Sequence, residues 1–309
     1  MTLEAKISLC IATYRRPVRL RALLNDVVAQ QRPPSEIIVV DNDAAGSARS
    51  VIEQRRRLGT PCPIHYSIQP AKNISLTRNR TVELASGDWL AFIDDDERAP
   101  ATWLRQLFDA AERYETDGVL GPVIPVVPND APSWIRSSFY AWARMQTGDA
   151  VPRNRLRFGN VLLRASLLKQ QVGPFDPAYG LTGGEDGDLL SRLVNDGARI
   201  VWCDQAVVHE PVESSRLLLR WLLRRALRGG QDFARHTFAG RYRHISTRSR
   251  SLFFLRSLAQ LLLAVGLMLV CLPFGRHRVV FWLLKAAANA GKLSVFWGWH
   301  YREYGGAPA

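Results

Sequence analysis

Residues 89–96 read WLAFIDDD, an apolar run followed at once by Asp94, Asp95 and Asp96. The run has the length and composition of a buried strand. Three successive carboxylates at its end repel one another, and a hard divalent cation is well suited to offset that repulsion because it prefers carboxylate oxygens. The alternative interpretation is a solvated acidic turn that caps the next helix. The position directly after a buried strand favours the cation.

Short apolar runs and helical patterns alternate on both sides of this stretch. Strands are expected over residues 7–12, 36–40, 64–67, 89–93, 119–123, 157–163 and 199–202, and helices over 17–30, 74–85, 101–114 and 185–195. This alternation is typical of βαβ units. We therefore expect an α/β fold with a mostly parallel, Rossmann-like sheet and helices on both of its faces.

Polar side chains follow two other expected strands. Thr13 and Arg15 come after the first strand, and Asp41 comes directly after the second. Ligands of open parallel sheets bind at the carboxyl ends of strands, where Asp41 can accept a hydrogen bond from a ribose or a base. An aspartate after a strand is also ordinary turn chemistry. Arg78, in the helix before Trp89, suits a phosphate or a carboxylate, or equally a surface position.

An acidic pair and a histidine occur later in the chain. Glu185 and Asp186 follow the glycine-rich run GLTGG, and His209 ends a short apolar run. A carboxylate at this place can take a proton from an attacking hydroxyl, or it can simply favour the helix dipole at an N-terminus. His209 is a candidate metal ligand, although a lone histidine is more often structural.

The composition changes after residue 215. Residues 216–250 carry ten arginines and one acid, Asp232, and an uncharged apolar stretch follows over 258–274. A basic turn and a second apolar stretch, 279–299, come next. This pattern predicts a basic amphipathic helix and a helical hairpin associated with an anionic membrane. A soluble helical bundle is the alternative. We expect two domains, 1–215 and 216–309.

The overall charge and the cysteines indicate partners and compartment. The chain has 41 Lys and Arg against 28 Asp and Glu, a net charge of +13. Because the surplus lies beside apolar helices, anionic lipid is a better partner for it than nucleic acid. The four cysteines show no metal-ligand spacing, and the N-terminal residues do not resemble a signal peptide, so a reduced, cytosol-facing protein is expected.

The motifs together resemble the family 2 glycosyltransferases, whose fold is called GT-A. The resemblance runs from about Ile7 to His209 and rests on four segments in the family's order: ISLCIATYRRP, the aspartate after the second strand, NISLTRNRTVELASGDWLAFIDDDE and GGEDGDLLSRL. The tail is similar to a bacterial subgroup, the succinoglycan and exopolysaccharide-assembly glycosyltransferases, which work on a lipid carrier at the cytoplasmic face of the inner membrane.

The resemblance implies a role for each motif. Asp96 would coordinate Mg²⁺ or Mn²⁺, with His209 completing the metal or diphosphate site. Asp186 would be the general base and Glu185 its acceptor-side neighbour, although the reverse assignment is open. The residues that would hold the nucleotide-sugar donor, most often a UDP-sugar, are Thr13, Arg15, Asp41, Arg78, Asp94, Asp95, Gly159 and Asn160.

The resemblance also implies a reaction. The enzyme would move a hexose such as glucose, with inversion, onto a lipid-linked saccharide. The aromatic run 133–142 would be an acceptor platform, or else a hydrophobic lid over the core. Two other functions are considered. A sugar-nucleotide pyrophosphorylase would favour a glycine-rich phosphate loop where this chain has IATYRRP. A membrane scaffold without activity would not need the acid triplet.

Overall fold

The computed structural model describes residues 5–136, 139–140, 144–242 and 250–304. Contacts divide the chain into two compact units, Met1–Pro125 with Ala143–Glu210, and Val126–Trp142 with Pro211–Ala309. The segment 126–142 thus groups with the tail, whereas the expected boundary at 215/216 would leave it in the first domain. That boundary stays a prediction. Four of the ten residues of the aromatic run 133–142 lie outside the described residues.

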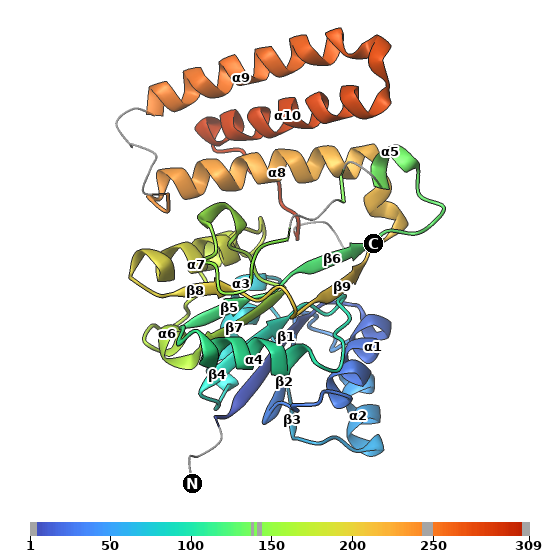
Figure 1. Cartoon of the computed structure of the whole chain (residues 1–309), viewed down its shortest axis with the longest axis vertical. Helices are drawn as coiled ribbons and strands as arrows, with labels where there is room; N and C mark the ends of the chain where they lie inside the picture. Colours follow the sequence, from blue (N-terminus) through green and yellow to red (C-terminus); the bar gives the residue numbers. More distant parts are fainter. Residues whose placement is uncertain (1–4, 137–138, 141–143, 243–249, 305–309) are drawn as a thin grey trace. The chain divides into compact units, whose positions relative to one another are not determined.

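The first unit contains a seven-stranded sheet whose order is β3-β2-β1-β4-β7-β5-β8 (Figure 1). Neighbouring strands pair in parallel except β7, which is antiparallel to β4 and to β5. The strands are β1 (Ile7–Thr13), β2 (Glu36–Asp41), β3 (Ile64–Ile68), β4 (Trp89–Ile93), β5 (Gly118–Leu120), β7 (Asn160–Arg164) and β8 (Ile200–Trp202). The expected α/β fold with a mostly parallel sheet is confirmed.

Two further strands, β6 (Val123–Val126) and β9 (Val208–Pro211), form a separate two-stranded sheet. The sequence predicts one strand over 119–123, but the chain leaves the main sheet after β5 and forms β6 from a new position. Pro122 lies at the break, where its carbonyl accepts hydrogen bonds from Val208 N and from the Asn160 side chain. The expected strand is therefore divided in two.

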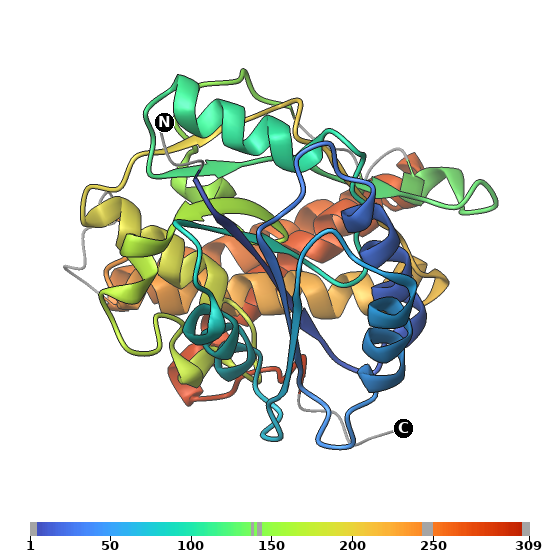
Figure 2. The ribbon, with the colours of Figure 1, turned by 90° about the horizontal axis from the view of Figure 1, so that it is seen from below.

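Helices cover both faces of the main sheet (Figure 2). Ile7, Leu9 and Ile11 of β1 belong to one core cluster with residues of three helices, whereas Cys10, on the opposite face, contacts Thr81 O. The alternation follows from the two-residue period of a strand. Each fully buried Leu or Ile stabilises the fold by about 1.5–3 kcal/mol. The helices are α1 (Pro17–Val28), α2 (Arg49–Leu58), α3 (Ile74–Leu84), α4 (Trp103–Arg113), α6 (Ala165–Lys169) and α7 (Glu185–Asn195).

Helix α2 is absent from the sequence-based expectations. Its sequence, RSVIEQRRRL, has apolar side chains chiefly at Val51 and Ile52, which are its buried residues. The remaining positions are mostly charged and face solvent, so hydrophobic periodicity gives a weak signal. Most of its stability comes from the packing of those two side chains in the core cluster.

The second unit is helical. It contains α5 (Ser133–Arg136), α8 (Leu219–Phe238), α9 (Arg250–Val270) and α10 (Arg276–Ser294), and α10 lies between α8 and α9 (Figure 1). Helix α9 begins earlier than the expected apolar stretch and therefore includes Arg256. Among the described residues, the segments Arg250–Val270 and Arg276–Trp297 are long and apolar enough to cross a membrane.

Helices α8 and α10 approach backbone to backbone through two glycines. A Cβ atom on Gly230 of α8 would lie 1.9 Å from the carbonyl oxygen of Ala288, and one on Gly291 of α10 would lie 2.0 Å from that of Leu227. No side chain fits in either place. The two helices therefore pack more closely than ordinary side chains allow, as small residues permit in helix pairs.

Candidate active site

The acid triplet follows β4, and two neighbouring segments hold its second and third carboxylates. Thr13, at the end of β1, donates from Oγ1 to Asp95 Oδ2 at 2.7 Å. Arg16 Nη1 donates to Asp95 Oδ1 at 3.0 Å and to Asp96 Oδ2 at 2.9 Å. Arg19 Nη1 lies 3.5 Å from Asp96 Oδ2. The pairing of β1 with β4 brings these groups together, as expected for the carboxyl ends of parallel strands.

Asp94 has different neighbours. Its Oδ1 accepts a hydrogen bond from Arg78 Nη2 at 3.2 Å, and its backbone N–H donates to Glu97 Oε2 at 3.1 Å. Arg78 lies on α3, which packs against β1 and β2. The triplet is therefore divided. Asp95 and Asp96 pair with arginines that follow β1, whereas Asp94 pairs with the arginine of α3.

The same Arg78 also pairs with Glu185. Its Nη1 lies 2.5 Å from Glu185 Oε1, and both side chains are almost fully buried. The guanidinium carbon lies 5.1 Å from the centroid of the Phe158 ring, within cation–π range. Arg78 thus joins the β4 end to the start of α7. The carboxylates of Glu185 and Asp94, rather than open solvent, surround its guanidinium.

The start of α7 is set by glycines. Gly183 and Gly184 have φ values of 82° and 94°, in the left-handed region that favours glycine. This turn buries Glu185 and leaves Asp186 half-buried. Asp186 Oδ2 accepts a hydrogen bond from Phe158 N at 3.2 Å. Of the acidic pair, Asp186 is therefore the more accessible, and the arginine ion pair belongs to Glu185.

Gly159 lies against the acid triplet. Its φ is 104°, and a Cβ atom there would lie 2.7 Å from Glu97 Oε1 and 3.4 Å from Asp94 Oδ2. Only glycine lets the backbone approach these carboxyl groups so closely. Asn160 serves the scaffold instead, because its side chain accepts from Trp103 Nε1 and donates to the carbonyls of Pro122 and Ala206.

Asp41 and Arg15 lie on the neighbouring strand ends. Asp41 is fully buried, and its Oδ2 accepts hydrogen bonds from Ala48 N at 2.8 Å and from the Tyr66 hydroxyl at 3.1 Å. It therefore orders the loop between β2 and α2. Arg15, with a φ of 53°, contacts Asp43 of that loop through Nε at 3.3 Å. The two sequence-predicted residues thus shape one loop at the sheet edge.

His209 and Glu210 approach the triplet from β9. The backbone of His209 exchanges hydrogen bonds with Arg98, two residues after Asp96. The charge of Glu210 raises the pKa of Asp94 and that of Glu97. Adjacent residues of a strand point to opposite faces, so the side chain of His209 and the side chain of Glu210 point in opposite directions.

Burial and mutual repulsion shift the acids of this cluster. Burial raises the pKa of Asp95 to about 6, against the opposing effect of the Arg16 charge. The pKa of the half-exposed Asp94 is also raised by partial desolvation, against the opposing charge of Arg78, and the charges of Asp96, Glu210 and Asp186 raise it further. The pKa of Glu97 is raised well above its usual value, again chiefly by burial. Such shifts are common at functional sites.

The chemistry of these donors fits a divalent cation. The carboxylates of Asp96 and of Glu210 on β9 both repel that of Asp94. Hard cations such as Mg²⁺ and Mn²⁺ bind oxygen ligands and would offset this repulsion. In the described part of the chain, no three acidic, histidine or cysteine side chains already surround a single point at ligand distance. Arg16 holds Asp95 and Asp96 in their place.

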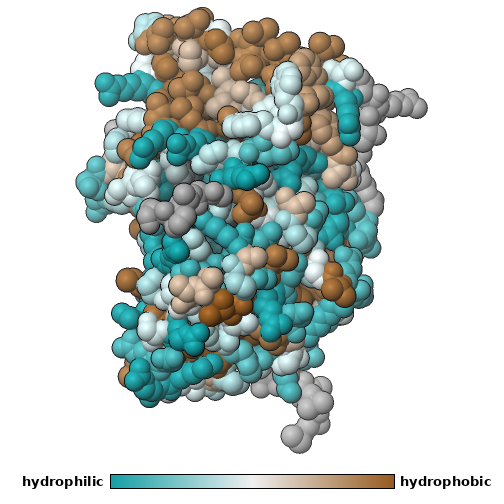
Figure 3. Space-filling model, turned by 180° about the vertical axis from the view of Figure 1, so that it is seen from behind, coloured by the Kyte–Doolittle hydropathy of each residue, from teal (hydrophilic) through white to brown (hydrophobic). Residues whose placement is uncertain are grey.

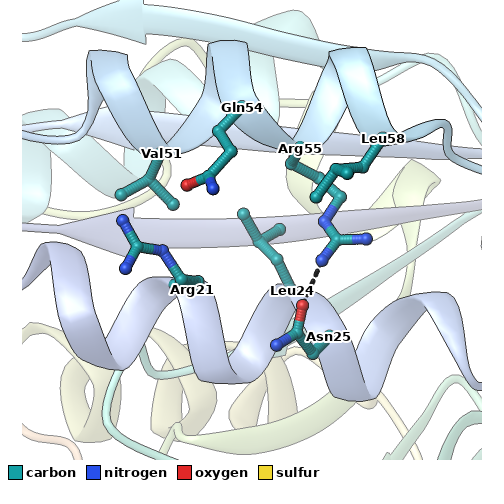
Figure 4. Close-up of a pocket in the computed structure, with 7 residues that line it drawn as sticks. All are labelled: Arg21, Leu24, Asn25, Val51, Gln54, Arg55 and Leu58. Carbon is teal, nitrogen blue, oxygen red and sulfur yellow. Dashed lines mark hydrogen bonds between the residues drawn. The ribbon is translucent and has the colours of Figure 1, made fainter.

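A pocket of about 140 Å³ lies elsewhere, between α1 and α2 (Figure 4). It contains no residue of the acidic cluster, and its lining comes from the helical layer rather than from strand ends. The lining residues are Arg21, Leu24, Asn25, Val51, Gln54, Arg55 and Leu58.

Sequence reasoning does not single out Arg16, Glu97 or Glu210. Each is the immediate neighbour of a residue that it does single out. Arg16 follows Arg15 in the RRP segment, Glu97 follows Asp96, and Glu210 follows His209. Adjacency to a motif is the only sequence signal for these three, and the structure adds the contacts that distinguish them.

The sheet order, the acid triplet at the carboxyl end of the central strand β4 and the Glu-Asp pair at a glycine turn define a glycosyltransferase of the GT-A class. The chain belongs to glycosyl transferase family 2, whose family model matches residues 8–168. It is 37% identical over 247 residues to the succinoglycan biosynthesis protein ExoM of Rhizobium meliloti (strain 1021), an alignment that covers 76% of this chain and 75% of that protein.

More distant proteins match the chain over nearly its whole length, by sequence or by structure. Glycosyltransferase AglE of Haloferax volcanii is 26% identical, over 93% of this chain and 95% of its own length. The mannosyltransferase PcManGT of Pyrobaculum calidifontis, in complex with GDP-Man and Mn²⁺, aligns with a TM-score of 0.65 at 17% identity, over 96% of this chain and 88% of its own. TarS 1–349 of S. aureus, in complex with UDP, aligns with a TM-score of 0.54 at 18% identity, over 96% and 93%.

Proposed function

We propose that this chain is an inverting glycosyltransferase that moves a hexose from a UDP-sugar to a lipid-linked saccharide during exopolysaccharide assembly. One observation carries the proposal. The half-buried Asp186 is bonded to Phe158 N, next to Gly159, whose backbone lies against Asp94. A proton acceptor and the acidic cluster therefore flank the same segment.

Asp186 is the better candidate for the general base. Glu185 is buried and paired with the Arg78 guanidinium, so it is not accessible to an acceptor hydroxyl. In the reaction, the acceptor oxygen bonds to the anomeric carbon while the bond from that carbon to the diphosphate oxygen breaks. The acceptor proton moves to Asp186, and the bonding electrons leave with the nucleoside diphosphate. A single displacement inverts the anomeric configuration.

The nucleoside diphosphate would lie along the ends of β1, β2 and β4. Thr13, Arg15 and Asp41 would contact the nucleotide directly or through the loop that Asp41 orders, and Asp94 would face the ribose. Asp96, with His209 or its neighbour Glu210 on β9, would hold Mg²⁺ or Mn²⁺. When bound, the cation neutralises charge on the departing diphosphate. GDP-Man and Mn²⁺, and UDP, occur in solved proteins of this fold.

The proposed acceptor and location rest on the helical unit and on the relative from Rhizobium meliloti. Exposed leucines crowd α9, and on the face in Figure 3 hydrophobic residues gather over the α9–α10 hairpin. Helix α8 adds an arginine-rich sequence. Apolar helices beside basic residues favour an anionic membrane surface, here the cytoplasmic face of the bacterial inner membrane.

A thermal-stability assay with UDP, GDP, dTDP and CMP, each with and without Mn²⁺, tests the donor site. We expect one diphosphate to raise the melting temperature only when the metal is present. Labelled sugar transfer from the matching donor to a lipid-linked acceptor then tests the reaction. A folded protein that responds to no nucleotide would instead support a scaffold without activity.

A further inference from the structure

Three of the cations on the α9–α10 hairpin lie in a part of the sequence, residues 250–302, that has no acidic residue. Arg256 is on α9, and Lys285 and Lys292 are on α10, two turns apart and so on one side of the helix. In the described parts of the chain, no carboxylate forms an ion pair with any of the three. Their charges need another explanation.

Lys292 is fixed in place by side chains of both helices. Its Nζ donates to Asn289 Oδ1 at 2.8 Å and to Gln260 Oε1 at 3.2 Å, and Asn289 Nδ2 donates to the carbonyl of Lys285 at 2.9 Å. Gln260 lies one turn after Arg256 on α9. An ammonium has three donors, so these two bonds leave one for a ligand. These bonds connect the turn of α9 that follows Arg256 to the turn of α10 that follows Lys285.

The charges of Arg256 and Lys285 both act on Lys292. Arg256 and Lys285 lie close enough to Lys292 to repel its ammonium, which is half-buried and 5.3 Å from the Phe233 ring. Uncompensated cations on apolar helices are unfavourable and occur mainly where they bind something. An anion among them would turn repulsion into attraction. Ammonium and guanidinium groups are the usual ligands of phosphate.

Exposed apolar side chains extend along α9 from the cationic cluster. Leu252 and Leu255 flank Arg256 and are 66% and 59% exposed, and Leu262 and Leu269, further along, are 64% and 55% exposed. A free phosphate would use the cations alone. An amphiphile with a phosphate at one end and a hydrocarbon chain at the other would use both surfaces.

We propose that Arg256, Lys285 and Lys292 form a binding site for the phosphate group of the lipid that carries the acceptor saccharide. The proposal rests on the lipid-linked acceptor of the proposed function and gives it a location in the chain. The lysines and the arginine contact the phosphate, Gln260 and Asn289 hold Lys292, and the hydrocarbon chain lies along the exposed leucines of α9.

Binding of farnesyl diphosphate to the full chain tests the site directly. The protein is placed in nanodiscs of zwitterionic phosphatidylcholine, and affinity is measured for wild type and for a K285Q/K292Q variant. We expect at least tenfold weaker binding by the variant. An R276Q/R278Q variant is the control, because it removes two charges from the exposed start of the same helix. It should bind as wild type does.

Equal affinity of K285Q/K292Q and wild type would overturn the proposal. So would inorganic pyrophosphate that binds as tightly as farnesyl diphosphate, which would indicate a site for a free anion. Phosphatidylglycerol that competes at equal concentration would indicate bulk anionic lipid and also overturn it. If the double variant melts early, K285Q alone replaces it, since Lys285 is exposed.

The nucleotide assay separates this inference from the proposed function. The metal-dependent thermal shift with a nucleoside diphosphate should be the same in wild type and K285Q/K292Q. A wild-type protein that binds farnesyl diphosphate through these cations but no nucleotide would retain the lipid site and lose the proposed reaction. The converse result would retain the reaction and remove the lipid site.

Discussion

Arg78 and Glu185 form a buried ion pair across 107 residues of sequence, with Nη1 2.5 Å from Oε1. The pair joins α3 to α7 and, through the second nitrogen of Arg78, to Asp94. A guanidinium at this place orients two carboxylates at once. The two terminal nitrogens of an arginine can bind a diphosphate. In Arg78 they bind Glu185 and Asp94 of the protein itself.

Removal of Arg78 should destabilise the first unit strongly. The R78M variant leaves Glu185 buried without its countercharge, a loss that costs about 3–5 kcal/mol. Urea unfolding at pH 7 measures it. The R78M/E185Q double variant should recover part of the loss, because no uncompensated charge remains. A cost below about 1 kcal/mol for R78M would show that the pair contributes little.

Replacement of Asp186 should remove activity and leave the fold intact. In D186N the amide retains an oxygen for Phe158 N but cannot take a proton, so we expect transfer to fall by about 10²–10⁴-fold. Melting temperature and Mn²⁺-dependent nucleotide binding should change little. E185Q is the comparison, and its main effect should be on stability. An active D186N enzyme would move the base elsewhere.

Two glycines with nearly the same backbone φ angle allow a controlled test of the packing around the acid triplet. Gly159 has a φ of 104° with Glu97 and Asp94 close by, whereas Gly197 has a φ of 102° and no heavy atom within 4 Å of a Cβ position. Both G159A and G197A incur the strain of positive φ, of order 1–2 kcal/mol. G159A alone should also lose nucleotide binding. Equal effects of the two substitutions on binding would contradict the close approach.

The pH dependence of stability reports on Asp95. Its pKa is raised to about 6 by burial, so its contribution to stability is fully present below about pH 4 and is lost as the pH rises through 6. The free energy of unfolding of D95N relative to wild type, measured in EDTA, should therefore increase by up to about 3 kcal/mol between pH 4 and pH 7.

Asp204 provides the opposite sign. The Arg144 guanidinium lowers the pKa of that carboxyl, so its contribution is present above about pH 4 and is lost as the pH falls. The stability of D204N relative to wild type should thus decrease as the pH rises towards about 4 and stay flat from pH 4 to pH 7, where that of D95N increases. If the D95N difference is flat from pH 4 to pH 7, Asp95 is not perturbed by burial.

The sequence predicts the strands of the sheet well because each is a short run of apolar residues bounded by turns, as EIIVV and WLAFI show. It predicts the acid triplet and Glu185–Asp186 because charged residues at such places are unusual. It does not predict that Arg78 pairs with Glu185, since the partners are far apart in the chain. The reversed direction of β7 likewise has no local signal, because parallel and antiparallel neighbours bury the same residue types.

Gly230 and Gly291 bring α8 and α10 within backbone contact, each glycine against a carbonyl of the other helix. Helices that interlock in this way cannot slide past each other without a clash. Helices α8 and α10 should therefore move together as one unit. We expect a tilt of the hairpin, whether set by bilayer thickness or by a bound lipid, to move the arginine-rich helix with it.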